Sequence, residues 1–403
     1  MAGPLAGVKV VEMGVWVAGP SCAGILADWG ADVIKIEPPT GDPFRGLFAN
    51  LPNTAAGNVN PPFELDNRGK RSIALDLEHE EARALARRLT DGADVFVSNM
   101  RPRVLKKYGL SYEELSATNP RLIYCQVTGY GPDGEDADRA AYDVGAFWAR
   151  AGVVANLMPG YDGEPPQQRG GMGDHMTGAN AAGAVSAALF NRERTGKGQR
   201  VAVSLVRVGV YMMGWDTNMQ LRLGTIGMTP YDRRHAVNPI INSFQDKDGR
   251  WFWLLLLQAD RHWPDVVRAI GAPQLLNDPR FVDIPARQVN AEALVAELDR
   301  IFATKTLEDW GSIFDRENVW FARVNNTAEV VEDPLVHAAG AFVDVEAADG
   351  AHAQVATPAD FYGTPVETRS WAPELGQHTE EILLELGYDW DGIIALKESG
   401  AIP

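Results

Sequence analysis

Cysteine, basic residues and long apolar runs are all scarce in this chain of 403 residues. The two cysteines, Cys22 and Cys125, provide no disulfide framework and suit a reducing compartment. Because 54 acidic residues outnumber 37 lysines and arginines, the net charge of -17 disfavours a large basic face for nucleic acid or anionic lipid. The longest apolar run, residues 251–257, is too short to cross a bilayer. We expect a cytoplasmic protein with neither nucleic-acid nor membrane partners.

Motifs typical of metal binding, of a serine nucleophile and of dinucleotide binding are also missing. The seven histidines show no metal-ligand spacing, and the chain has no Cys-x-x-Cys, His-Glu-x-x-His or Gly-x-Ser-x-Gly motif, so we predict no metal. Glu37 lies where a ribose-binding acid belongs in a dinucleotide-binding protein. However, Gly14 and Gly19 do not form Gly-x-Gly-x-x-Gly, and Pro20 removes an amide that would face phosphate. Dinucleotide binding is therefore disfavoured.

The apolar periodicity predicts an α/β fold. Residues 8–12 and 31–37 have the pattern of buried strands, and residues 20–29 between them have the pattern of a helix. Further strands are expected at 72–77, 93–97 and 122–127, with helices between them. This alternation predicts a Rossmann-like parallel sheet with helices on both faces and ligands beyond the carboxyl ends of the strands.

The composition of the sequence changes near residue 224, where proline, tryptophan and short strand patterns become frequent. We expect a smaller α+β domain at 224–327, inserted into a large domain formed by 1–223 and 328–403. The large domain is expected to contain the functional site, because it carries the parallel sheet.

The run around Asp174 is the most informative part of the chain. Glycines at 170, 171 and 173 leave room for a ligand to approach the backbone, and a helix of small residues is expected at 176–190. Asp174 would then lie where a loop enters a helix, and the amide dipoles there favour its ionised form. A nucleophilic carboxylate needs that setting.

A structural role for Asp174 is the alternative. Aspartate is a good N-cap, so its side chain would simply accept a hydrogen bond from the amide of Met176 or Thr177. His175 is adjacent, but neighbours at a helix start point about 100° apart, so we expect no His–Asp pair between them.

The order of several motifs resembles the class III CoA-transferases, the formyl-CoA and carnitine CoA-transferase family. The resemblance covers nearly the whole chain. It rests on Ala18-Gly19-Pro20, Arg45-Gly46, the run 67–77, Asn99 to Pro102, Ala141 to Val144, Gly173-Asp174 and Gly196 to Gln199.

The resemblance implies transfer of coenzyme A from an acyl-CoA to a free carboxylic acid, with Asp174 as nucleophile. Its carboxylate would form a mixed anhydride and then its own CoA thioester, without ATP or metal. Glycine amides near Asp174 are expected to stabilise the oxyanions. The family also implies an interlocked homodimer.

The resemblance assigns further residues to the site. Trp16 and Val17 are expected to line the thioester pocket, while Tyr142 and Asp143 flank the reacting group. The remaining expected CoA contacts are Asn99, Met100, Lys107 and Tyr108. The motif residue Arg45 and a basic cluster of Lys70, Arg71 and Arg101, with Arg103 and Lys106 nearby, are expected to meet CoA, whose phosphates need local positive charge. The basic residues at 106 and 107 also fit a solvated helix face.

Two other functions remain open. Racemases of the same family carry a His where this chain has Tyr142 and a Glu roughly where Gln258 falls, and without these groups a second base is missing. A CoA-binding protein without turnover is the other alternative. Val17 and Pro38 depart from the formyl-CoA transferase pattern, and the glycine-only loop is absent near 224–227, so we expect an acid larger than oxalate or formate.

Overall fold

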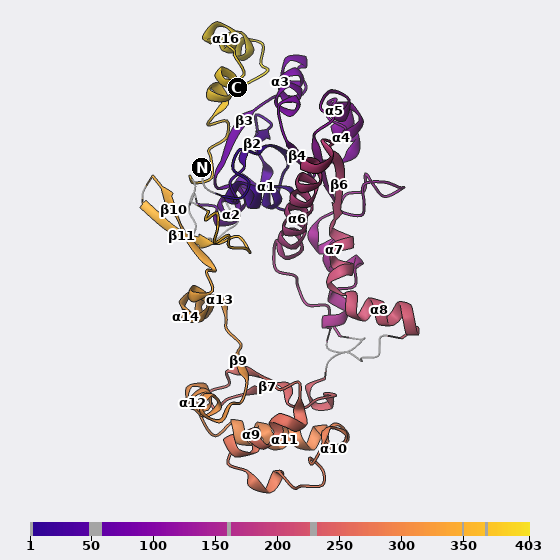
Figure 1. The fold of residues 1–403 in the computed structure, drawn as a ribbon, viewed down its shortest axis with the longest axis vertical. Coiled ribbons are helices and arrows are strands. Elements are labelled where there is room, and N and C mark those ends of the chain that lie inside the picture. The colour runs from indigo at the N-terminus through magenta and orange to yellow at the C-terminus, as the bar shows by residue number, and fades with distance from the viewer. Residues whose placement is uncertain (1–2, 48–58, 159–162, 226–231, 349, 367–369) are drawn as a thin grey trace. The chain divides into compact units, whose positions relative to one another are not determined.

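The computed structural model describes residues 3–47, 59–158, 163–225, 232–348, 350–366 and 370–403. The chain divides into two compact units, which we describe separately (Figure 1). Unit 1 comprises Met1–Val154, Gln167–Asn218 and His337–Pro403, and unit 2 comprises Ala155–Pro166 and Met219–Val336. The assignment of a CoA-binding domain and a smaller inserted domain stays a prediction.

Unit 1 contains a six-stranded sheet in the order β3-β2-β1-β4-β5-β6. All neighbouring strands are parallel, which confirms the predicted parallel sheet. The strands are β1 (Lys9–Met13), β2 (Asp32–Glu37), β3 (Lys70–Ala74), β4 (Val95–Ser98), β5 (Ile123–Thr128) and β6 (Gln199–Ser204). The strand order reverses direction between β1 and β4, and ligands of such sheets bind beside that point.

Helices cover both faces of this sheet, so its strands are apolar on both sides. Val10 and Val33 belong to the core that also contains α1 (Ala18–Asp28) and α6 (Met172–Thr195). Val11 and Ile36 belong to the opposite core. The helices of that second core are α3 (Glu80–Asp91), α4 (Pro102–Lys107), α5 (Tyr112–Thr118), α15 (Thr379–Glu385) and α16 (Trp390–Glu398).

Helices α1 and α6 approach each other closely because small residues lie between them. A Cβ at Gly178 would lie 1.9 Å from the Ser21 Oγ. Ala181 and Ala182 are also fully buried in the same core. Since α6 carries Asp174, this packing fixes the position of that residue relative to the sheet.

Several elements differ from the sequence-based expectation. Helix α6 begins at Met172 rather than near residue 176. The apolar pattern of residues 204–223 predicts one long helix, but the structure has two helices there, because Met213 leaves helical geometry (φ -89°, ψ 21°) and Gly214 follows it. Elements of unit 1 that the sequence did not predict include α2 (Pro61–Asn67), α4 (Pro102–Lys107), the π-helical segment η2 (Val144–Arg150) and an antiparallel hairpin within residues 342–355. Proline at the first turn starts both α2 and α4.

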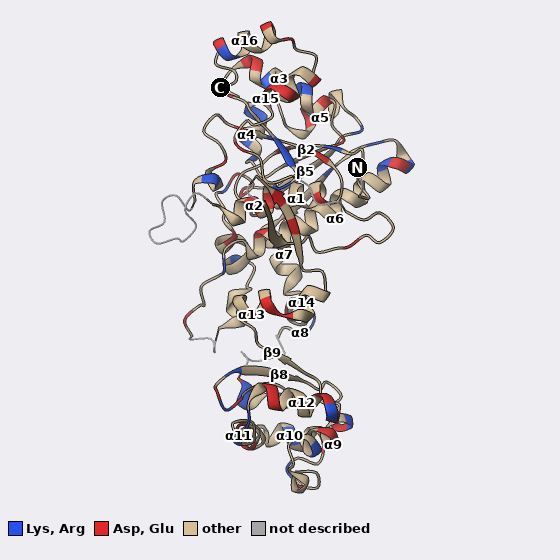
Figure 2. Cartoon of the chain, turned by 90° about the vertical axis from the view of Figure 1, so that its left-hand side faces the viewer, with Lys and Arg blue, Asp and Glu red and all other residues tan. Residues whose placement is uncertain are grey.

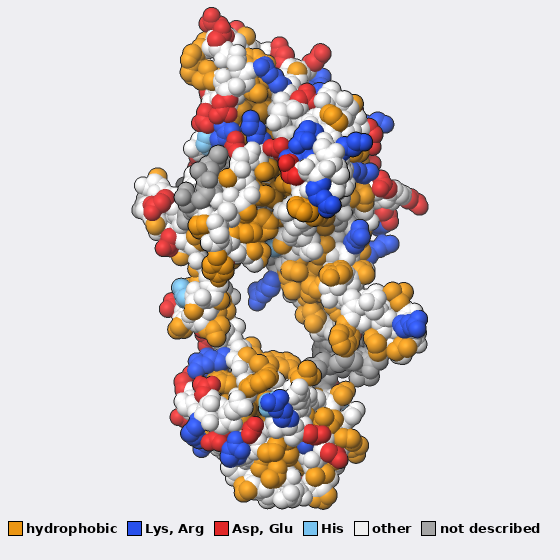
Figure 3. Space-filling model, viewed as in Figure 1, with side chains coloured by type: hydrophobic (Ala, Val, Ile, Leu, Met, Phe, Trp, Pro, Cys, Tyr) orange, Lys and Arg blue, Asp and Glu red, His pale blue; other side chains and the backbone are white. Residues whose placement is uncertain are grey.

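The remaining elements of unit 1 surround this framework. They are η1 (Pro43–Gly46), η3 (Val154–Leu157, at the border with unit 2), α7 (Leu205–Met212), α8 (Gly214–Leu223, at the other border), and the antiparallel hairpin β10 (Phe342–Ala347) and β11 (Gly350–Val355). Helix α7 leaves large apolar side chains exposed, and Figure 3 shows apolar surface over α7 and α8.

Unit 2 has its own core around Phe302, Trp263 and Trp310. An antiparallel sheet of three strands covers it, in the order β7-β8-β9. Charged residues of both signs lie on its helices (Figure 2). The elements are η4 (Arg233–His235), β7 (Ile241–Gln245), β8 (Trp251–Leu255), α9 (Ala259–Ala269), η5 (Pro273–Leu275), α10 (Ile284–Val289), α11 (Ala291–Phe302), α12 (Leu307–Glu317), β9 (Phe321–Arg323), α13 (Thr327–Glu332) and, at the border, α14 (Pro334–Ala338).

Candidate active site

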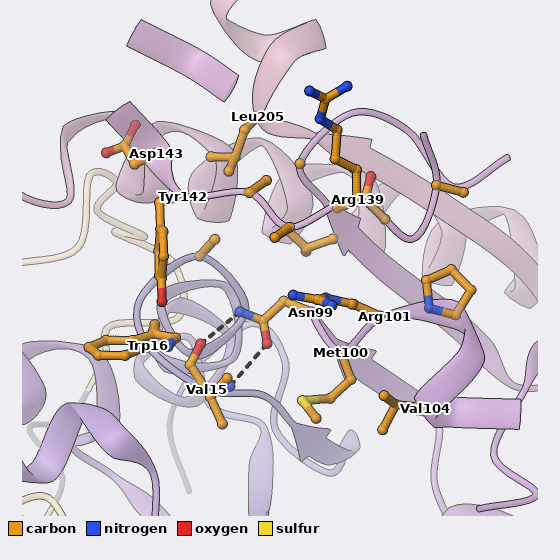
Figure 4. Close-up of a pocket in the computed structure, with 18 of the residues that line it drawn as sticks. Val15, Trp16, Asn99, Met100, Arg101, Val104, Arg139, Tyr142, Asp143 and Leu205 are labelled. Atoms are coloured by element: carbon orange, nitrogen blue, oxygen red, sulfur yellow. Dashed lines mark hydrogen bonds between the residues drawn. The ribbon is translucent and has the colours of Figure 1, made fainter. Parts of the chain in front are cut away.

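A cavity of about 350 Å³ opens at the carboxyl ends of β1, β4 and β5 in unit 1. It lies where the topology of a parallel sheet places ligands. Its wall combines the loops after these strands with the segment 137–143 and with the start of α6. The predicted site residues that line it include Asp174 and Arg103. The others are Trp16, Asn99, Met100, Arg101, Tyr142 and Asp143, which are labelled in Figure 4.

Asp174 lies inside the first turn of α6 and does not cap it. The N-cap position is Gly171, which adopts a left-handed conformation (φ 74°) and makes no side-chain cap. The N-cap interpretation of Asp174 is therefore wrong. Within the described residues the half-buried Asp174 carboxylate accepts no hydrogen bond, and it lines the cavity. It is thus available to a ligand.

Asp143 takes over the capping of α6 from a distant part of the chain. Its Oδ2 accepts hydrogen bonds from the amides of Gly173 (2.9 Å) and Asp174 (3.3 Å), and its Oδ1 accepts one from Gln168 Nε2 (2.7 Å). Asp143 is buried, and it directly precedes the π-helical segment η2. These two amides are consequently occupied and are not free to stabilise an oxyanion, whereas the same expectation for the other glycine amides near Asp174 stays a prediction.

The charge state of Asp174 also differs from the expectation. Burial, and then the negative charge of Asp143, raise the pKa of Asp174 to about 7. Helix dipoles favour an anion at this place, but desolvation and a neighbouring carboxylate outweigh them. The expected effect of the amide dipoles is therefore not the one that sets the pKa of Asp174.

The loop after β1 forms the aromatic side of the cavity and is held tightly. Asn99 bonds Val15 twice, with Nδ2 donating to the carbonyl (2.7 Å) and Oδ1 accepting from the amide (3.0 Å), as Figure 4 shows. The Trp16 amide donates to Asp42 Oδ1 (3.0 Å). Trp16 has a positive φ of 63°, which is rare outside glycine and costs roughly 1 kcal/mol or more. Its ring meets Tyr142 edge-on at 6.0 Å.

A buried network of charges lies beneath this loop. Lys35 Nζ donates to Glu12 Oε1 (2.8 Å) and to the carbonyl of Gly14 (3.0 Å). Lys70 Nζ donates to Glu12 Oε2 (2.6 Å) and to Asn67 Oδ1 (3.0 Å). Lys70 is 1% exposed and does not line the cavity. Lys70 is therefore paired inside the protein, and Lys35 is the member of this network that bonds the loop.

Arginine side chains supply the positive charge in the lining of the cavity. Arg101, Arg103 and Arg139 line it, and all three are exposed. Arg139 pairs with Asp136 (3.1 Å), whereas the guanidinium groups of Arg101 and Arg103 form no ion pair with the described residues. Unpaired guanidinium groups are suited to bind phosphate oxygens.

The other predicted contacts lie elsewhere in unit 1, and their roles in CoA binding stay predictions. Arg45 forms two hydrogen bonds to Glu37 (2.8 and 2.6 Å). Arg71 binds Asp32, Glu381 and Glu385 on the outside of the sheet. Lys107 and Tyr108 both bond Glu78. Val17 is buried in a small cluster with Phe44 and Phe63, next to Trp16. None of these five residues lines the cavity.

Two features of the site escaped the sequence analysis. Arg139 lines the cavity, and the one sequence feature that could have indicated this is its position three residues before Tyr142. His175 Nε2 lies 3.1 Å from Oδ1 of Asp66, a contact across 109 residues of sequence. No local sequence pattern indicates that Asp66 is the partner of His175, because the two residues are far apart in the sequence.

The described residues contain no group of three or more His, Cys, Asp or Glu side chains arranged to hold a metal ion. Among the same residues, no helix has the length and apolar character needed to span a membrane.

Comparisons with known proteins point to one family. Residues 5–379 match the family model described as CoA-transferase family III. The chain is 33% identical to (R)-2-hydroxy-4-methylpentanoate CoA-transferase of Clostridioides difficile over 99% of both chains. It is 30% identical to cinnamoyl-CoA:phenyllactate CoA-transferase of Clostridium sporogenes, over 95% of this chain and 93% of that one. A crystal structure of a CAIB/BAIF family protein from Brucella suis matches with a TM-score of 0.83 and 32% identity, over 96% of this chain and 100% of that chain.

Proposed function

The chain belongs to CoA-transferase family III, and we propose that it moves coenzyme A from an acyl-CoA to a carboxylic acid through a thioester on Asp174. Transfer of CoA between acyl-CoA and carboxylates follows from the family. The observation that supports Asp174 as the attacking group is its carboxylate, which lines the cavity and accepts no hydrogen bond from the described residues. Asp143 and the packing of α6 against α1 hold it in place.

The proposed steps conserve the thioester. A carboxylate oxygen of Asp174 attacks the donor carbonyl, the carbon–sulfur bond breaks, and CoA leaves as the thiolate with a mixed anhydride on Asp174. The thiolate then attacks the aspartyl carbonyl, the anhydride C–O bond on that side breaks, and the donor acid departs as a carboxylate. An acceptor carboxylate repeats these steps in reverse. Covalent relay replaces one difficult exchange by easier acyl transfers.

We place the phosphates of CoA at Arg101 and Arg103. Both guanidinium groups line the cavity and lack an ion-pair partner in the described part of the chain. By contrast, Lys70, Arg71 and Arg45 are neutralised by carboxylates. A cation that is already paired gains less from a phosphate, since it must first give up its partner.

Replacing Arg101 or Arg103 by glutamine should therefore raise KM for acyl-CoA about tenfold and change kcat little, because each removes a charge-assisted hydrogen bond outside the reacting centre. Steady-state kinetics at low and high salt measure this, and the difference should shrink as salt screens the charge. Arg316→Gln is the matched control, since Arg316 is exposed in unit 2 and pairs with Glu317. An unchanged KM in both site variants would contradict this placement.

The acid that is exchanged should carry a sizeable apolar group. Trp16 and Tyr142 offer aromatic surface beside Asp174, and both line the cavity. Two relatives are named for the acids 2-hydroxy-4-methylpentanoate and phenyllactate, which combine a carboxylate with an aliphatic or aromatic group. We propose acids of that class for this chain.

Isotope exchange separates transfer from the two alternatives. A 2-methylacyl-CoA incubated with an acceptor acid in deuterated water should give the new CoA ester, with no deuterium at the alpha carbon of the donor. Tyr142 and Gln258 offer no His and Glu pair for racemisation. Mass spectrometry reads both products. Deuterium uptake at the rate of turnover would indicate a racemase, and binding without either product would indicate a CoA-binding protein.

The quaternary structure and cellular location remain parts of the proposal. We propose a homodimer of interlocked chains, supported by the exposure of Tyr211 (83%) and Trp215 (78%) on α7 and α8. Apolar side chains this exposed indicate a surface that is covered in the assembly. We also propose a cytoplasmic location, supported by two free cysteines.

A further inference from the structure

His175 has an unusual partner directly beside the proposed nucleophile. Its Nε2 lies 3.1 Å from Oδ1 of Asp66, near the end of α2. The Asp66 side chain is 2% exposed, and its Oδ2 is buried without a hydrogen-bond partner in the described part of the chain. A carboxylate so poorly solvated needs a nearby cation to remain charged. His175 is the side chain that touches it.

Two further carboxylates of unit 1 act on the charge of His175. Asp174 precedes His175 in α6, and Asp143 caps that helix. The negative charges of both act on the imidazole. Burial raises the pKa of Asp66, the hydrogen bond and charge of His175 lower it, and the charges of Lys70 and Glu12 act on it in opposite directions. Burial by itself would lower the pKa of His175, but the hydrogen bond to Asp66 and the charges of Asp66, Asp174 and Asp143 raise it above its ordinary value.

We propose that His175 is a positioning residue for the transfer reaction: held as an imidazolium by Asp66, it supplies the positive charge that keeps Asp174 ionised against the repulsion of Asp143. This inference rests on the proposed role of Asp174 as nucleophile. Only the ionised carboxylate has the charge and the free lone pair for attack on a thioester. His175 transfers no proton in this role.

The arrangement explains how two carboxylates can adjoin in one site. Asp143 is needed to cap α6, but its charge disfavours ionisation of Asp174. The imidazolium opposes that effect, and its charge lowers the pKa of Asp174. Because Asp66 is buried, the ion pair is shielded from solvent on one side and holds the ring in one orientation.

The test is the pH dependence of kcat/KM for wild type and His175→Gln. Activity should rise with pH as Asp174 ionises, and loss of the positive charge should move the midpoint of this rise upward by about 1 pH unit. His175→Lys, which keeps a cation, should return the midpoint towards that of wild type. Titration of the CoA phosphates is common to all variants and cancels in the comparison.

The control is His79→Gln, because His79 is exposed at the start of α3 and lies outside the cavity lining. Its midpoint should equal that of wild type. An unmoved midpoint in His175→Gln, or a loss of the same factor at every pH, would overturn the inference and leave His175 a structural residue. Failure of the proposed function is distinguishable, since wild type itself would then form no CoA thioester on Asp174.

Discussion

Asp174→Asn should abolish CoA transfer, with a loss of at least about 10³-fold in kcat. An amide is a poor nucleophile towards a thioester, so neither the anhydride nor the aspartyl thioester forms. The substitution is nearly isosteric, and the Asp174 side chain does not cap α6, so the helix should persist. Transfer is measured with an acyl-CoA and a 2-hydroxy acid, and circular dichroism confirms the fold.

The covalent intermediate gives this prediction a second readout. Wild-type protein incubated with acyl-CoA and then hydroxylamine should gain a hydroxamate at residue 174, located by peptide mass spectrometry, whereas Asp174→Asn should gain none. Asp315→Asn is the control, since Asp315 is an exposed carboxylate on α12 in unit 2. Near-normal transfer by Asp174→Asn would remove the proposed mechanism.

Gly173→Ala should reduce activity by about 10²-fold, although it adds only a methyl group next to the nucleophile. A Cβ at this position would lie 2.3 Å from Asp143 Oδ1 and 2.3 Å from the Phe147 ring, so either the cap or the ring must move. Overpacking of this kind costs about 1–3 kcal/mol of stability. Displacement of the cap also displaces Asp174, because Asp143 bonds the amides of both residues.

Gly183→Ala in the same helix separates this contact from the general effect of alanine. No atom outside the neighbouring helix backbone lies within 4 Å of a Cβ at Gly183. Alanine there should stabilise the protein by up to about 1 kcal/mol through helix propensity and leave transfer unchanged. Thermal unfolding and initial rates of both variants make the comparison. Full activity in Gly173→Ala would show that the Asp143 cap does not control the position of Asp174.

The parallel sheet was predictable because its strands are buried on both faces. Such strands are rich in apolar residues, as around Val10, Val33 and Val95, and this pattern is visible without tertiary information even though β1 and β2 also carry the buried charges Glu12 and Lys35. The position of the cavity followed as well, because loops after parallel strands meet at one edge. Asp174 was predictable as a site residue from its glycines and from the family motif.

The electrostatics of the site were not predictable, because they depend on contacts between distant segments. Lys70 has the sequence context of a solvated cation, but Glu12 lies close to it across the sheet and neutralises it. The pKa of Asp174 depends on burial and on Asp143, 31 residues away in sequence. The helix dipole was the only effect that the sequence indicated. It lowers the pKa of Asp174, whereas burial and Asp143 raise it.

The cap on α6 has a consequence for the order in which the chain folds. The amides of Gly173 and Asp174 in the first turn of α6 donate to Asp143, which lies outside the helix. The first turn is therefore complete only after the segment that carries Asp143 has docked. The middle of α6 packs against α1 and the sheet, makes no contact within the described residues that depends on the Asp143 cap, and can form earlier. A folding intermediate with a nearly complete sheet would therefore remain catalytically incompetent. Competence would arise in the last docking step, late in maturation.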